Sequence, residues 1–333
     1  MSGVRPKPKL GFLGVGWIGR HRMEAMLATG DVEAAAVSDP SQAMVTAAKA
    51  LAPHAAVTET LEAMLELNLD GIVIASPSAL HADQSVHALN AGAAVFCQKP
   101  LGRNAHEAAL VVATARRADR LLSVDFSYRY TSGMMRIAEL VRAGILGDVY
   151  AVDLTFHNAY GPDKPWFYDR TLSGGGCVID LGVHLVDLAL WVLGFPDISG
   201  DIHANLFAKG KPLVSVEQVE DYAIASFTLA SGVAVRLTCS WRLHAGQDAQ
   251  IEALFYGTQG GAALRNVSGS FYEFRAEHFV STQRYLLAGS TEEWGGRAAA
   301  AWATKLRADA RFDPAADEMV AVSRVLDQIY AAR

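Results

Sequence analysis

Three glycines near the start of the chain have the spacing of a phosphate-binding loop. Gly14, Gly16 and Gly19 follow the apolar run 10–13 and lead into a segment with helical character. In such a loop the first glycine permits a tight turn, and the second lets the backbone approach a pyrophosphate. The third lets the helix pack close to the strand, while the helix N-terminus supplies N–H donors. The pattern predicts a dinucleotide site; the alternative is a tight turn in a sheet that binds no nucleotide.

An acidic residue stands where a ribose would lie in such a site. Asp39 ends the second predicted strand, 20 residues after Gly19, and a carboxylate there accepts hydrogen bonds from the adenosine ribose hydroxyls. The same carboxylate would repel the 2′-phosphate of NADP. Pro40 and Ser41 follow and bring no positive charge to offset that repulsion. We therefore expect NAD rather than NADP.

Lys99, Asp180 and His184 are suited to proton chemistry. Lys99 follows the fifth predicted strand, at the carboxyl edge where open α/β sheets bind ligands, and Pro100 restricts its backbone to an extended conformation. Asp180 and His184 lie four apart on a predicted helix and share a face, and an imidazole can take the proton of an alcohol near neutral pH. Taken alone, a surface lysine and a structural Asp–His pair are the commoner explanations.

The segments around that helix carry further expectations. The glycines 174–176 before it are expected to let a substrate approach the backbone. Asp187, one turn beyond His184, is expected to be structural.

The first third of the chain alternates apolar runs with helical stretches, which indicates a doubly wound parallel sheet. The runs are continuously apolar, as expected for strands covered on both faces. The predicted strands are 10–15, 32–38, 71–75, 93–97 and 121–124. The predicted helices are 19–28, 40–51, 61–66, 79–91 and 104–118.

After about residue 125 the pattern changes to longer strands of alternating polarity, typical of an antiparallel sheet. In 233–241, valine, leucine, cysteine and tryptophan occupy one face and more polar residues the other. Helices are expected at 178–193 and 314–332, and loops at 158–170 and 270–297 are expected to set substrate specificity. The predicted strands are 149–157, 221–229, 233–241, 250–256 and 262–267.

Composition excludes several classes of protein. The 333 residues are 51% hydrophobic and 19% charged with a net charge of −6, which fits a two-domain globular protein and gives little support to nucleic-acid binding. No uninterrupted apolar run is long enough to span a bilayer. The three cysteines are widely spaced, which argues against a disulfide framework or a zinc site and favours the cytoplasm.

Four motifs together resemble the glucose–fructose oxidoreductase/inositol dehydrogenase/MocA family; they span residues 14–19, 75–81, 98–100 and 174–184. The resemblance runs over nearly the whole chain. It implies an N-terminal Rossmann domain (1–125) and a C-terminal α/β domain (126–333) with a large open, mostly antiparallel sheet; the helix at 314–332 could pack back on the first domain. It also implies NAD-dependent oxidation of a hydroxyl, or reduction of a carbonyl, on a sugar, cyclitol or related polyol.

The resemblance also implies roles for individual residues. Lys99 would bridge cofactor and substrate, His184 would exchange the proton, and Asp180 would hold the imidazole or contact a substrate hydroxyl. Trp17, Ile18, Ser76, Pro77 and His81 correspond to positions that line the cofactor. Aromatic rings and hydroxyl groups suit carbohydrate, and the candidates are Tyr128, Arg129, Tyr130, Tyr160, Trp166 and Tyr168. Arg129 could instead form a salt bridge between the domains.

The chain departs from the family at Gln98, where most members have glutamate. The change removes a negative charge that would stabilise the ammonium form of Lys99. Lys99 is then expected to be neutral more readily and to share proton transfer with His184, which the pH–rate profile of Gln98→Glu tests.

The sequence therefore predicts an NAD-dependent dehydrogenase that acts on a sugar or polyol and forms a homodimer or homotetramer through the C-terminal sheet. Metal, nucleic-acid and membrane partners are not expected. Two alternatives remain: an NAD-dependent glycosidase that uses transient oxidation, and a catalytically inactive dinucleotide-binding regulator. A regulator would be expected to have lost Lys99, Asp180 and His184, and all three are present.

Overall fold

The computed structural model describes residues 6–215, 217–289 and 291–332, so residues 1–5, 216, 290 and 333 of the two predicted domains lie outside it. The chain divides into two compact units. Within the described residues the first comprises 6–102, 106–125 and 295–320, and the second comprises 103–105, 126–294 and 321–332.

The first unit contains a six-stranded parallel sheet in the order β3-β2-β1-β4-β5-β6. Both faces are covered, so Phe12, Ile72 and Phe96 have at most 1% of their surface exposed. The predicted doubly wound parallel sheet is confirmed, and only the two-residue β3 was not expected. The strands are β1 (Lys9–Leu13), β2 (Glu33–Ser38), β3 (Ala56–Val57), β4 (Gly71–Ile74), β5 (Ala94–Cys97) and β6 (Leu122–Val124).

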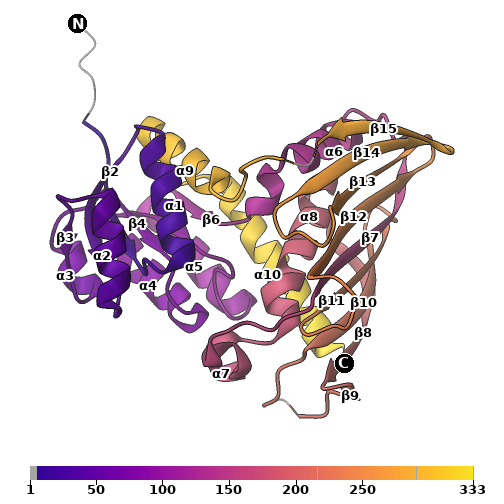
Figure 1. Cartoon of the computed structure of the whole chain (residues 1–333), viewed down its shortest axis with the longest axis horizontal. Helices are drawn as coiled ribbons and strands as arrows, with labels where there is room; N and C mark the ends of the chain where they lie inside the picture. Colours follow the sequence, from indigo (N-terminus) through magenta and orange to yellow (C-terminus); the bar gives the residue numbers. More distant parts are fainter. Residues whose placement is uncertain (1–5, 216, 290, 333) are drawn as a thin grey trace, which may run out of the picture. The chain divides into compact units, whose positions relative to one another are not determined.

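Helices connect these strands and cover the sheet (Figure 1). One of them, α9, comes from near the end of the chain and packs on α1, and its Trp302 ring lies 5.7 Å from that of Phe96. This helix was not predicted from the sequence. The helices are α1 (Trp17–Ala28), α2 (Gln42–Leu51), α3 (Leu61–Leu65), α4 (Ser78–Asn90), α5 (Ala105–Ala118) and α9 (Arg297–Ala308).

The second unit is built on a nine-stranded sheet in the order β15-β14-β13-β12-β7-β11-β10-β8-β9. All neighbours are antiparallel except β7 and β11, which run parallel, so the predicted open, mostly antiparallel sheet is confirmed. The strands are β7 (Val149–Asn158), β8 (Ile198–Ala208), β9 (Lys211–Pro212), β10 (Tyr222–Leu229), β11 (Ala234–Ser240), β12 (Ala249–Gly257), β13 (Gly261–Asn266), β14 (Phe274–Val280) and β15 (Gln283–Ala288).

Only one face of this sheet carries helices. The helices α6 (Ser132–Arg142) and α8 (Val183–Leu193) pack on it, and no helix of the described residues covers the other face (Figure 1). On β7, the buried Leu154 alternates with Asp153, which pairs with Arg236 across the open face. The chain ends in the 15-residue helix α10 (Asp317–Ala331). Short elements complete the chain: η1 (Ser127–Tyr130), η2 (Pro165–Tyr168), α7 (Arg170–Ser173), η3 (Val178–Gly182) and η4 (Pro314–Ala316).

The prediction of a loop over 270–297 is wrong, because this segment contains two strands. Phe274–Val280 and Gln283–Ala288 pair as an antiparallel hairpin at the edge of the sheet. Ser281 takes a positive φ of 53° in the tight turn between them. Charged residues on both strands dilute the apolar signal, as is common at sheet edges, and this hid the hairpin in the sequence.

One helical stretch of the described residues bears on the expectation about membrane-spanning segments. The helical stretch Arg170–Leu193 is long enough, and apolar enough on average, to cross a bilayer. However, 83% of its most apolar window is buried inside the protein, so this stretch is a core helix.

Candidate functional site

The glycine loop joins β1 to α1, and each glycine meets a different requirement. Gly14 has a φ of +85°, and a side chain there would meet the Ala75 carbonyl oxygen at 2.5 Å. A Cβ on Gly19 would lie 2.0 Å from the Gly14 carbonyl oxygen, so only glycine lets the helix approach the loop. At Gly16 nothing lies within 4 Å of a Cβ, which leaves room for a ligand against the backbone.

The start of α1 fits an anionic ligand. No side chain of the described residues caps this helix, and its first turn contains no acidic residue. The first intrahelical bond runs from the Arg20 N–H to the Gly16 carbonyl. The dipole at such an N-terminus favours negative charge. Trp17 and Ile18, 56% and 36% exposed, begin the helix.

Asp39 lies beside this loop. One carboxylate oxygen accepts the Val15 N–H at 2.9 Å, and the other accepts the Ser41 N–H at 2.9 Å. Each oxygen keeps a further lone pair for a ribose hydroxyl. Asp39 therefore also orders the loop, a role that the sequence did not predict.

The loops after β4 and β5 are tied together by His81. Its ring is 1% exposed, and its two nitrogens lie 2.7 Å from the Ser76 and Pro100 carbonyl oxygens. Burial lowers the pKa of His81. Contacts of Ser76, Pro77 and His81 with a cofactor stay predictions.

Lys99 is half-buried two residues after the end of β5, and the Lys99–Pro100 peptide bond is cis. The preceding Gln98 donates its side-chain N–H to Asp125 at 2.6 Å, and Arg22 donates its Nε–H to the same carboxylate oxygen at 2.6 Å. Asp125, the residue after β6, is 1% exposed. Neither Arg22 nor Asp125 was singled out from the sequence, because no motif joins residues so far apart along the chain.

All of these groups follow the carboxyl ends of parallel strands in one sheet. They come from the loops after β1, β2, β4 and β5, where open α/β sheets bind ligands, around the point where the strand order reverses between β1 and β4. This edge fits a dinucleotide.

Asp180 and His184 lie in the second unit, at the junction of η3 and α8. The turn of η3 is a π-helix, a feature that is frequent at functional sites. Asp180 accepts the indole N–H of Trp241 at 3.1 Å. His184 is 8% exposed, and its ring packs edge-on against Tyr128, with 4.8 Å between the ring centroids. Both side chains are thus held by aromatic residues, of which Trp241 was not predicted.

The glycines 174–176 were expected to let a substrate approach the backbone, and the structure gives them a different role. A Cβ on Gly175 would lie 1.9 Å from the Tyr330 hydroxyl oxygen, and one on Gly176 would lie 1.9 Å from the Glu220 carbonyl oxygen. Gly174 has a φ of +87° and lies against Arg103. Close packing inside the protein explains these glycines.

Arg129 pairs with Asp187 within the second unit, and the suggested interdomain salt bridge of Arg129 stays a prediction. The shortest contact is 2.5 Å, and Nε donates to both carboxylate oxygens. Asp187 is 1% exposed, which agrees with its expected structural role.

Three of the remaining substrate candidates lie in the 158–170 loop: Tyr160, Trp166 and Tyr168. Tyr168 packs edge-on against Trp241 and donates its hydroxyl to the Pro162 carbonyl. Trp166 stacks on its neighbour Phe167 in η2. Tyr160 is 55% exposed, and its hydrogen bond to Asp248 raises its pKa. Substrate contact by these residues, and by Tyr130 at the end of η1, stays a prediction.

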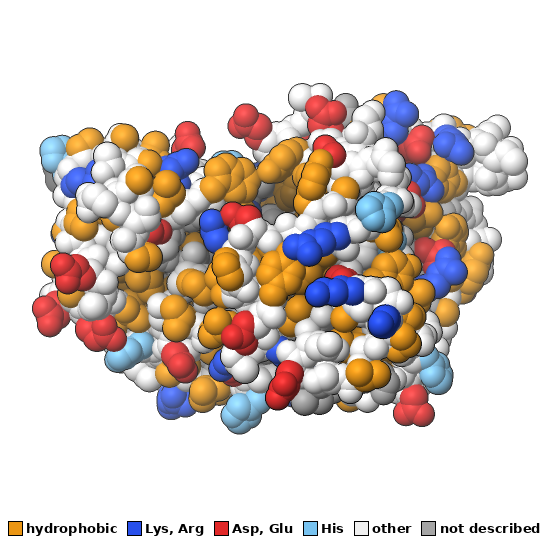
Figure 2. Space-filling view, turned by 60° about the horizontal axis from the view of Figure 1, so that its bottom comes forward, with side chains coloured by type: hydrophobic (Ala, Val, Ile, Leu, Met, Phe, Trp, Pro, Cys, Tyr) orange, Lys and Arg blue, Asp and Glu red, His pale blue; other side chains and the backbone are white. Residues whose placement is uncertain are grey.

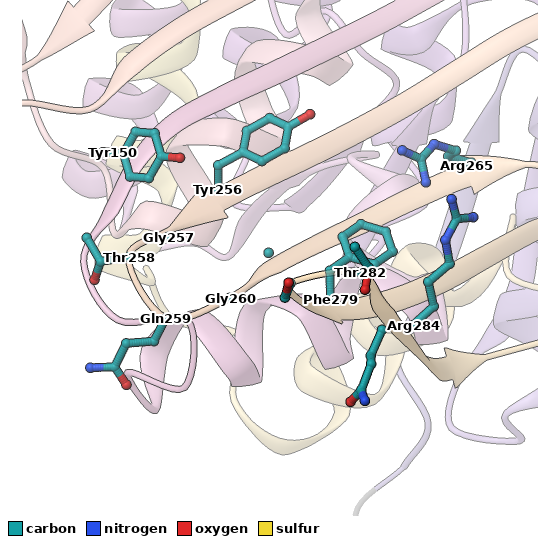
Figure 3. A pocket seen from close by; sticks show the side chains of 13 residues that line it. Tyr150, Tyr256, Gly257, Thr258, Gln259, Gly260, Arg265, Phe279, Thr282 and Arg284 are labelled. Atoms are coloured by element: carbon teal, nitrogen blue, oxygen red, sulfur yellow. The ribbon is translucent and has the colours of Figure 1, made fainter.

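The rest of the described surface offers no comparable set of groups. A hollow at one end of the second unit's sheet is lined by Tyr256, Arg265, Phe279 and Arg284, and by none of the predicted site residues (Figure 3). Among the described residues no three His, Cys, Asp or Glu side chains are grouped to hold a metal ion. On the face shown in Figure 2, Lys and Arg are interspersed with acidic and apolar side chains.

Comparisons with known proteins agree with this arrangement. Residues 9–126 match the model of an oxidoreductase family with an NAD-binding Rossmann fold, and residues 134–263 match the model of the GFO/IDH/MocA C-terminal domain. D-glucoside 3-dehydrogenase of Escherichia coli is 29% identical over 70% of this chain and 70% of its own length. A protein of Amycolatopsis mediterranei, assigned as a UDP-kanosamine synthase oxidoreductase subunit, is 30% identical over 82% of this chain and 79% of its own length.

Among solved structures, GenD2 from gentamicin A biosynthesis, in complex with NAD, has a TM-score of 0.81. The match is 25% identical in sequence and covers 99% of this chain and 95% of that one.

Proposed function

Because the chain belongs to the Gfo/Idh/MocA family of NAD-binding oxidoreductases, we propose that it oxidises a hydroxyl group of a sugar, cyclitol or related polyol with NAD. The observation that carries this proposal is the geometry of the glycine loop. Gly16 leaves open space, the start of α1 is uncapped by described side chains, and Asp39 stands at the loop's edge. Relatives named as a glucoside 3-dehydrogenase and an inositol 2-dehydrogenase support the substrate class.

The proposed acid–base chemistry belongs to Lys99, Asp180 and His184. When bound, NAD supplies the acceptor for the hydride that leaves the substrate carbon. His184 takes the proton of the same hydroxyl, so the alcohol becomes a carbonyl with its atoms and electrons balanced. Lys99 donates a hydrogen bond to the reacting oxygen, and Asp180, held by Trp241, contacts a neighbouring hydroxyl or orients the imidazole.

Asp39 supports the choice of NAD over NADP. Its carboxylate would repel a 2′-phosphate, and both its oxygens are fixed by backbone N–H groups, so it cannot easily turn away.

The test is a screen of sugars, cyclitols and sugar acids with NAD and with NADP, in which absorbance of the reduced cofactor is followed. Stoichiometric formation of NADH supports a dehydrogenase. Release of a sugar without accumulation of NADH would identify a glycosidase instead, and tight binding of NADH with no turnover of any substrate would identify a regulator.

The open face of the nine-stranded sheet is the surface that we propose for pairing with another copy of the chain. Ile224 and Leu286 are 39% and 62% exposed, although both lie in sheet strands. Light scattering of the wild type and of Leu286→Glu tests this proposal, and a monomeric wild type would refute it.

The cytoplasm is the proposed location. Cys97, Cys177 and Cys239 are buried, unbridged thiols, as expected in a reducing compartment, and burial raises the pKa of Cys97 to about 12. Cell fractionation tests the assignment.

A further inference from the structure

Glu220 is a fully buried acidic residue two positions before β10, outside the predicted site. Its carboxyl oxygen Oε1 accepts the N–H groups of Gly176 and Val178, each at 2.9 Å. Its main-chain carbonyl accepts the N–H of Cys177 at 3.0 Å. Three consecutive amides, 176–178, therefore bond to this one residue.

These amides stand at the entry to the helix that carries the proposed acid–base pair. The first N–H groups of a helix have no partner within it and need one elsewhere. Glu220 supplies that partner through its side chain and its main chain at once. Asp180 follows two residues later and His184 six residues later, so the position of this turn determines where both side chains lie.

A second contact holds the acid itself. The Tyr330 hydroxyl, from α10, donates to Oε1 of Glu220 at 2.8 Å. The same hydroxyl fills the space that a side chain on Gly175 would need, and the Glu220 carbonyl does so at Gly176. The glycine turn thus packs directly against Glu220 and Tyr330, and no side chain larger than that of glycine fits at positions 175 and 176.

This arrangement is not explained by stability alone. Burial raises the pKa of Glu220, and its Oε2 has no hydrogen-bond partner among the described residues. An apolar residue of similar size would avoid the cost of burying such a group, but its side chain could not accept the N–H groups of Gly176 and Val178.

We propose that Glu220 is a positioning residue for the oxidation, fixing the helix start from which Asp180 and His184 project; this rests on the function proposed above. The geometry of the three amides carries the inference. A reacting group displaced by about 1 Å can lose roughly a hundredfold in rate.

The test compares Glu220→Ala with Glu220→Gln, which keeps an acceptor oxygen at the place of Oε1. We expect kcat of the alanine variant to fall by roughly ten- to a hundredfold, with the Kd for NADH unchanged. The glutamine variant should stay within about threefold of the wild type, because its carbonyl can accept the same N–H groups. Tyr330→Phe gives a milder variant, with an expected loss in kcat of about two- to fivefold.

Leu264→Ala is the matched control, since Leu264 is buried in the same unit but packs near Gly133 of α6. It should lower the melting temperature without a matching loss in kcat. The inference is overturned if Glu220→Ala keeps the kcat of the wild type. It is also overturned if Leu264→Ala and Glu220→Ala lower the melting temperature equally and lose the same amount of kcat.

Hydrogen exchange of the amides at 176–185 gives a readout that needs no substrate. We expect faster exchange in Glu220→Ala and unchanged exchange in Glu220→Gln and Leu264→Ala. If the wild type oxidises no substrate but exchange follows this pattern, the proposed function fails and the contact stands. If exchange does not respond to Glu220→Ala, the positioning role fails whatever the substrate.

Discussion

Gln98→Glu would place two carboxylates against each other beside Lys99. The Gln98 side-chain nitrogen lies 2.6 Å from Oδ2 of Asp125, which is 1% exposed and already bonded by Arg22. The substitution replaces that donor nitrogen by an oxygen of nearly the same position. An attractive hydrogen bond thereby becomes a contact between like charges.

Two energies limit the loss of stability: the repulsion between the two carboxylates, and the cost of protonating one of them. Two like charges about 4 Å apart cost about 4 kcal/mol at an effective dielectric constant of about 20. The introduced carboxyl can instead take up a proton; at pH 7, about 2.7 units above its ordinary pKa, this costs about 3.7 kcal/mol. Arg22 offsets part of either cost. We therefore expect the free energy of unfolding of the first unit to fall by about 2–4 kcal/mol at pH 7.

The loss should depend on pH in a defined direction. The pKa of the introduced carboxyl is raised in the folded state, so its penalty is absent below about pH 4.3 and grows as the pH rises through the raised value. Hydrogen exchange in urea, read on peptides of α1 and β5, reports on the first unit at about pH 4.5 and 7. Equal stability of variant and wild type at pH 7, or a loss that is the same at both pH values, would refute the reasoning.

Three further outcomes are expected. Asp39→Asn should raise the NADP-to-NAD ratio of kcat/KM by about tenfold or more, because a repulsive charge is removed; steady-state kinetics with both cofactors checks this, and an unchanged ratio would contradict the role of Asp39. His184→Asn should lower kcat by roughly a hundred- to ten-thousandfold with unchanged NADH binding, whereas His157→Asn, a second buried histidine of the same unit, should not. Burial raises the pKa of Glu220 in the folded state, so the wild type loses stability as the pH rises through this raised pKa. The urea midpoint of Glu220→Gln should therefore increase relative to that of the wild type from about pH 4.5 upward. A difference in midpoint that is constant with pH would argue against a titrating Glu220.

The elements that sequence periodicity identified are those buried on both faces or strictly alternating. All five predicted strands of the first unit are present, because a continuous apolar run between glycines has few other solutions in an α/β protein. The edge hairpin β14–β15, the strands β8 and β9, and the helices α6 and α9 were not predicted. Charges on the hairpin dilute its pattern, and the contacts of α9 with α1 join segments far apart in the sequence.

The same distinction applies to the candidate site. Gly14, Gly19 and Asp39 act within one local strand–turn–helix unit, so their spacing identifies them. Asp125 and Glu220 act through bonds to residues 27 and more than 40 positions away. No periodicity or motif encodes such a bond, and only the folded chain reveals it.

Gln98 shows why a charge counted along the sequence can mislead. The substitution of the family's glutamate suggested that Lys99 had lost a negative neighbour, yet the side chain of Gln98 is bonded to the buried carboxylate of Asp125. Gln98→Glu alone therefore adds a second carboxylate, and any change in its pH–rate profile mixes that repulsion with an effect on Lys99. The double variant Gln98→Glu/Asp125→Asn keeps one carboxylate and one amide in contact and moves only the negative charge, from position 125 to position 98. If the absence of a carboxylate at that position makes Lys99 more readily neutral, the limb of the profile along which neutral Lys99 becomes available must move to higher pH in the double variant. A limb that stays in place refutes the shared proton transfer.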